Sequence, residues 1–65
     1  MQKSTGMFDK FGNLLRVGDI AQHTLQSGRV VGVTIDGVFR DKLCVHFFSG
    51  GDMVELDVRP EELSL

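Results

Sequence analysis

Eight glycines divide this chain of 65 residues into short segments, and their spacing constrains the fold more than any other feature. The segments between the glycines are rich in Val, Ile, Leu and Phe, a composition typical of strands joined by tight turns. No segment keeps apolar residues at the i, i+3, i+4, i+7 spacing over the three turns of a long amphipathic helix. The sequence therefore predicts an all-β protein.

The alternation of apolar and polar residues predicts where the strands lie. We expect four main strands, at residues 17–25, 29–35, 42–48 and 53–58. The second strand contains Gly32, and a glycine inside a strand marks a bulge or a sharp bend. Small barrels use such a bend to let one strand take part in two sheets.

Three turns are predicted between these strands, at residues 26–28, at Asp36-Gly37 and at residues 49–52. Asp-Gly is the strongest of the three signals, because a type I′ hairpin turn requires positive φ at both central residues and this dipeptide tolerates it. Residues 38–41 would then widen the loop of this hairpin before the next strand begins.

The C-terminal end completes the expected topology. Pro60 fixes φ and lacks an amide donor, so residues 59–62 favour a single 3-10 turn. Residues 63–65 leave room for one very short closing strand. About five antiparallel strands with one 3-10 turn near the C-terminus follow the plan of a small SH3-like barrel, so we expect residues 1–65 to form a single domain of this type.

Residues spread over positions 16–65 carry a first resemblance: Val17-Gly18-Asp19, His23, Gly28-Arg29-Val30, Val45-His46-Phe47, Leu56 and Leu63. They resemble the Tudor-like and KOW-like barrels of bacterial proteins, in which "GD.V.H" leads to "G.V", then "V.F" and a closing leucine. Ala21 departs from that pattern, which has a larger aliphatic residue there. Modules of this kind occur on transcription-coupling factors and at the ends of repair helicases. Their motifs are mostly structural, so the resemblance implies the fold rather than a function.

The N-terminal third carries a second resemblance: Met1-Gln2, Thr5-Gly6-Met7, Asp9 to Asn13 and Gly18-Asp19-Ile20, with Asp36 to Phe39 further on. These residues are similar to phage-encoded YopX-like proteins, which begin "TG..D..G…..GDI" and later contain "DG.F". The resemblance implies a phage or prophage origin and an ordered turn at residues 9–13. Without it, residues 1–14 would be interpreted as a flexible tail. We expect any flexibility within residues 1–6, and the order of residues 1–5 stays open.

Charge and cysteine content narrow the class of protein. The formal net charge is −2, whereas dedicated nucleic-acid binders are usually basic. Residues 1–51 carry the excess of positive charge and residues 52–65 the excess of negative charge. A lone cysteine, Cys44, excludes an internal disulfide and is typical of a reducing compartment. With no apolar run long enough for a membrane helix, we expect a cytoplasmic protein without membrane contact.

Few residues suggest chemistry of their own. Cys44, His46 and His23 are the soft metal ligands, but a structural zinc site needs four ligands. Cys44, His23 and an acid are the residue types of a catalytic triad, but the sequence shows no sign of an activated thiol. Five Phe without Trp or Tyr make a weak aromatic cage, and residues 49–52 lack the lysine of a phosphate loop. We therefore predict no enzyme activity, metal or cofactor, and keep an oligomeric enzyme as a remote alternative.

Side-chain alternation predicts the two faces of the strand at residues 42–48. Leu43, Val45 and Phe47 share one face, which we assign to the core with Val54, Leu56 and Val58. Phe48 must then face outward beside His46, and on the first strand Ile20, or else Ala21, faces outward as well. An outward phenylalanine indicates a contact patch, unless residues 1–14 fold back and cover it with Phe8 and Phe11.

We expect the contact surface to consist of five residues: Phe39, Arg40, Lys42, His46 and Phe48. The leading hypothesis is a non-catalytic module that binds a host or phage protein, or a second copy of the chain. The alternative is a KOW-like barrel that binds DNA or RNA through Arg16, Arg29, Arg40 and Lys42.

Overall fold

The structure, a computed structural model, describes residues 4–65. The prediction that residues 1–6 are flexible falls partly on residues 1–3, which lie outside the described range. The elements within it are β1 (Ser4–Phe8), β2 (Leu14–Arg16), β3 (Ile20–Thr24), β4 (Val30–Phe39), β5 (Lys42–Ser49), β6 (Asp52–Val58), the 3-10 turn η1 (Pro60–Glu62) and β7 (Leu63–Ser64). The predicted all-β class is confirmed, as is the 3-10 turn at the proline.

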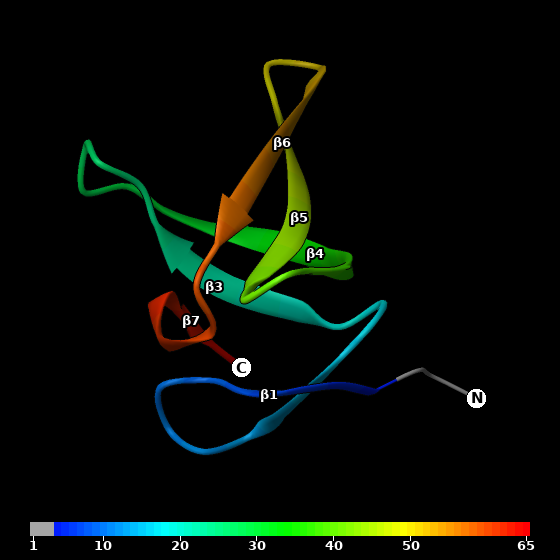
Figure 1. The fold of residues 1–65 in the computed structure, drawn as a ribbon. Coiled ribbons are helices and arrows are strands. Elements are labelled where there is room, and N and C mark those ends of the chain that lie inside the picture. Colours follow the sequence, from blue (N-terminus) through cyan, green and yellow to red (C-terminus); the bar gives the residue numbers. More distant parts are fainter. Residues whose placement is uncertain (1–3) are drawn as a thin grey trace.

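All strand pairs are antiparallel, in two sheets (Figure 1). β1 and β2 form a small hairpin, and the main sheet has the order β6-β5-β4-β3-β7. The long strand β4 pairs with β3 from Val30 to Thr34 and with β5 from Thr34 to Phe39. The two halves of β4 therefore bond to different neighbours, and the sheet curls around the core. The bend predicted at Gly32 would let one strand take part in two sheets, whereas β4 lies within a single sheet and exchanges its partners at Thr34.

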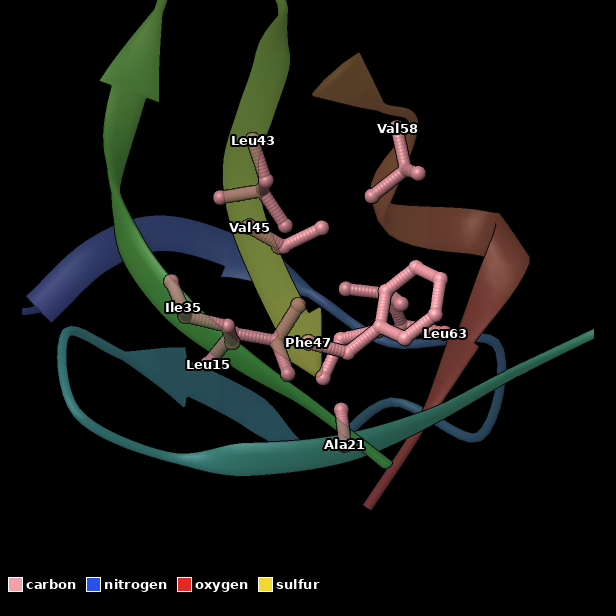
Figure 2. Close-up of a cluster of buried hydrophobic side chains, with 9 residues drawn as sticks. Leu15, Ala21, Ile35, Leu43, Val45, Phe47, Val58 and Leu63 are labelled. Carbon is pink, nitrogen blue, oxygen red and sulfur yellow. The ribbon is translucent and has the colours of Figure 1, made fainter. Parts of the chain in front are cut away.

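The core lies on the concave side of the main sheet. Its buried residues are Leu15, Ala21, Val33, Ile35, Leu43, Val45, Phe47, Val58 and Leu63 (Figure 2). The predicted inner face of β5 is confirmed, because Leu43, Val45 and Phe47 are all buried. On β6 only Val58 is fully enclosed, whereas Val54 and Leu56 are half-buried and pack against the cluster from the edge.

The N-terminal hairpin is part of the packed structure, as the ordered turn at residues 9–13 predicted. Asp9 accepts hydrogen bonds from the amides of Phe11 (2.9 Å) and Asn13 (2.7 Å), which close the turn. The same carboxylate accepts a bond from the amide of Leu65 at 2.8 Å, so it joins the turn of the N-terminal hairpin to Leu65. On β2, Leu15 is fully buried in the core.

The predicted turn at Asp36-Gly37 is wrong. Both residues lie inside β4, where the register shifts between Ile35 and Gly37 and Asp36 forms a bulge. The hairpin instead turns at Arg40-Asp41, with Arg40 at a φ of 62°. The longer hairpin adds three residue pairs to the ladder. The bulge also shifts side-chain alternation by one residue. As a result Ile35 and Val38 lie on the same side of the sheet, where they pair across the ladder with Val45 and Leu43, respectively.

Other strand boundaries differ less from expectation. Val17 to Asp19 form a turn rather than the start of a strand, because the amide of Asp19 donates to the carbonyl of Arg16 and Gly18 has a φ of 95°. The turns predicted at residues 26–28 and 49–52 are confirmed, and in the latter Gly50 and Gly51 both have positive φ. No helix among residues 4–65 is long and apolar enough to cross a bilayer.

Candidate contact surface

The outer face of β5 carries the predicted contact residues. Phe47 is 8% exposed, whereas its neighbour Phe48 is 67% exposed, so the predicted assignment of inward and outward phenylalanines is confirmed. Strand alternation places Lys42, Cys44 and His46 on the same outer side as Phe48. The open choice on β3 is also settled, because Ile20 is exposed and Ala21 is buried.

One end of this face is an aromatic and apolar cluster. The rings of His46 and Phe48 meet edge to face, with centroids 5.7 Å apart and planes at 86°. Met53, on β6, lies directly opposite Phe48 and is also exposed. Asp36 holds the imidazole in place, with a distance of 2.8 Å from its carboxylate to Nδ1 of His46. The bulge in β4 thus positions the acid that orients one of the predicted contact residues.

The other end of the face is formed by the β4–β5 turn. Phe39 is 63% exposed, and the guanidinium of Arg40 lies over its ring at 5.4 Å from the centroid. Phe39 pairs directly with Lys42 across the hairpin. A hollow of about 260 Å³ lies here, and its remaining lining residues are the acids Asp41 and Asp57. The predicted Phe39, Arg40 and Lys42 therefore form one mixed-charge cluster.

An acidic hollow separates these two clusters. It has a volume of about 270 Å³ and is lined by Asp36, Cys44, Val45, Glu55, Leu56 and Asp57. Burial raises the pKa of the Cys44 thiol, and the adjacent carboxylate of Asp57 raises it further. This environment opposes formation of the thiolate that a catalytic cysteine needs. The five predicted contact residues thus share a face but form two groups, with Cys44 between them.

Sequence analysis missed three features of this face. Met53, Glu55 and Asp57 contribute from β6 because they lie opposite Phe48, His46 and Cys44. Their alternation with the half-buried Val54 and Leu56 is visible in the sequence, and the glycine pair at residues 50–51 is the signal that sets their register against β5. The alternative in which Phe8 and Phe11 cover Phe48 is wrong, since all three rings are exposed.

Of the three residues considered for a metal or a triad, His23 lies apart from Cys44 and His46. His23 faces the other side of the sheet from His46, and its Nδ1 is 3.4 Å from the carbonyl oxygen of Glu62. Within residues 4–65, no three His, Cys, Asp or Glu side chains are arranged to hold a metal ion. The basic residues are also dispersed, because Arg29 and Arg40 flank opposite ends of β4.

Comparison with known protein families, with curated proteins and with solved structures found no match to this chain.

Proposed function

We propose that this protein is a non-catalytic module that binds another protein through the outer face of β5 and the adjoining β6. The observation that carries the proposal is the cluster of the exposed side chains of Phe48 and Met53 with the half-buried ring of His46. Aromatic residues and Met are enriched where proteins meet, and exposed apolar clusters mark interaction sites. Strand pairing fixes the backbone beneath Phe48 and Met53, and the carboxylate of Asp36 lies 2.8 Å from Nδ1 of His46, so binding would cost little freedom of the backbone and of the imidazole.

The SH3-like barrel remains part of this proposal. A curled five-stranded antiparallel sheet, a strand shared between two neighbours and a 3-10 turn before a short last strand support it. The Tudor-like and KOW-like resemblance supports the same fold, and the YopX-like resemblance supports a phage or prophage origin. Folds of this kind carry many unrelated functions, so the exposed face rather than the fold is the basis for the proposal.

Nucleic-acid binding is the second candidate, favoured by one observation. Phe39, Arg40 and Lys42 combine an exposed ring with two cations, the elements that stack on bases and contact phosphates. Asp41 and Asp57 line the same hollow and would repel phosphates. The net charge of −2 opposes this function as well.

Photo-crosslinking separates the two candidates. Benzoylphenylalanine is placed at Phe48 or, as a matched control, at Phe11, which is equally exposed but lies on the N-terminal turn. We expect a discrete protein adduct from position 48 in a lysate of the native cell, reduced by Met53→Ser and absent from position 11. Equal adducts from both positions would contradict the proposal. Gel shifts with DNA and RNA at about 50 mM salt test the second candidate, whose affinity must fall steeply with added salt.

A further inference from the structure

The strand β6 is a long free edge of the main sheet. It pairs with β5 over seven consecutive residue pairs without a bulge, and no other strand among residues 4–65 pairs with it (Figure 1). The opposite edge of the sheet, β7, has only two residues. Free edges present unpaired amide and carbonyl groups that another strand can bind.

The register identifies which backbone groups point outward. The two-residue turn Gly50-Gly51 joins Ser49 to Asp52, and such a turn is closed by a hydrogen-bonded pair. Hydrogen-bonded and non-hydrogen-bonded pairs alternate along an antiparallel ladder. Met53, Glu55 and Asp57 therefore direct their N–H and C=O groups toward the free edge. Three residues in alternate positions offer a regular template for a further strand.

This edge lacks most of the features that protect free strands. β6 contains no proline, no lysine and no bulge, and β5 is the element that lies along it. Its inner side chains, Val54 and Leu56, are only half-buried. Aliphatic side chains from an added strand would complete their burial. The outer side chains Glu55 and Asp57 are exposed acids, so the edge favours an added strand that carries positive charge.

We propose that a protein partner adds an extended segment to β6, and that Lys or Arg alternate with aliphatic residues in this segment. The inference rests on the proposed binding function and names the mode of binding and the chemistry of the partner. Basic residues on the outer side of the segment would lie opposite Glu55 and Asp57, and an apolar residue opposite Met53. Opposite charges on neighbouring strands stabilise the pair, and the acidic hollow beside Cys44 adds Asp36 to the same field.

A second copy of the chain fits this edge poorly. Two β6 strands paired antiparallel about Glu55 would place Glu55 opposite its own copy and each Asp57 opposite Met53. Like charges directly opposite each other destabilise a strand pair. The acids thus disfavour self-pairing while favouring a basic partner.

Amide hydrogen exchange by NMR tests the strand addition. The probe is a short capped peptide in which Lys, Val, Arg, Val and Leu follow one another, and its control carries N-methyl groups on the amides that would face β6. In the free protein we expect fast exchange at Met53, Glu55 and Asp57 and slow exchange at Val54 and Leu56. Saturating peptide should slow exchange at the first three by about tenfold or more, and the methylated peptide should not.

Charge exchange tests the partner chemistry. Glu55→Lys should weaken binding of the basic peptide by about fivefold or more and confer binding to a peptide with Glu at the basic positions. Glu61→Lys, the same charge change on the 3-10 turn, should leave both affinities unchanged. Unaltered exchange at the outward amides, or equal binding of the methylated peptide, would overturn strand addition. If Phe48 resonances nevertheless shift, or position 48 still crosslinks a protein, the proposed function stands and only this inference fails.

Discussion

The substitution Leu15→Ala tests whether the N-terminal hairpin belongs to the core. Leu15 is 0% exposed and is the one residue of β2 in the buried cluster. Removing three buried carbons forfeits about 2.4 kcal/mol of transfer free energy. The cavity raises the expected loss to about 3–4 kcal/mol, within the range known for buried Leu→Ala changes. A chain of 65 residues has a stability of about 3–10 kcal/mol, so the loss is a large fraction of the total.

Urea unfolding followed by far-UV circular dichroism measures this loss, because the chain has neither Trp nor Tyr for fluorescence. With a slope of about 1 kcal/mol per molar urea, the midpoint should fall by about 3 M. Leu65→Ala is the matched control, since Leu65 is 50% exposed and should cost about 1 kcal/mol or less. Leu15→Met preserves the side-chain volume, so its smaller loss of unfolding free energy can be measured even if the alanine variant does not fold. A Leu15→Ala cost below about 1 kcal/mol would refute the packing of β2 against the sheet.

Three further predictions follow from single sites. Burial would raise the pKa of Asp9, but hydrogen bonds from Leu65, Asn13 and Phe11 outweigh it and lower the pKa from 3.8 to about 2. The stability that ionised Asp9 provides is therefore complete above about pH 4 and is lost as the pH falls toward 2. The loss of unfolding free energy caused by Asp9→Asn, measured by urea unfolding, should become smaller over that range. Arg40→Gly should raise stability by about 0.5–1 kcal/mol in the same assay, because Arg40 has a φ of 62° that glycine adopts without strain. Native Cys44 should react with iodoacetamide at pH 8 about tenfold more slowly than the urea-unfolded chain, since its raised pKa and partial burial suppress the thiolate.

Each of these predictions has a contradicting result. A stability difference between wild type and Asp9→Asn that is constant from pH 7 to pH 2 would show that the carboxylate does not hold the N-terminal turn against Leu65. Arg40→Ala serves as the control for lost side-chain contacts, and a glycine variant no more stable than the alanine variant would argue against the left-handed turn. Equal alkylation rates in the native and unfolded states would place Cys44 at an open surface.

Sequence reasoning identified the elements that local patterns determine. The alternation in residues 42–48 separated Phe47 from Phe48 because the buried neighbours Leu43 and Val45 set the phase of the strand. The glycine pair at residues 50–51 and Pro60 each fix local backbone geometry, so the turns at those positions were predictable. The ordered turn at Asp9 was expected from a resemblance alone, although its cause, a carboxylate that accepts several amide bonds, is a recognisable turn signal.

The failure at Asp36-Gly37 shows the limit of local signals. Asp-Gly favours a turn, but a turn there would leave Val38 and Phe39 outside the ladder. Pairing them with Leu43 and Lys42 instead extends the sheet, at the cost of positive φ at Arg40. The contribution of β6 to the contact surface, in contrast, follows from a local signal. The two-residue turn at Gly50-Gly51 sets the register that places Met53 opposite Phe48 and Glu55 opposite His46.

The proposed binding surface depends most directly on the opposite orientation of Phe47 and Phe48 on β5. A carbon-edited NOESY spectrum should show contacts from the Phe47 ring to methyl groups of the buried cluster to which it belongs, which includes Ala21 and Leu63 (Figure 2). The Phe48 ring should contact His46 and the methyl group of Met53 and no core methyl. Contacts from Phe48 to Ala21 or Leu63 would reverse the faces of β5 and remove the proposed binding surface.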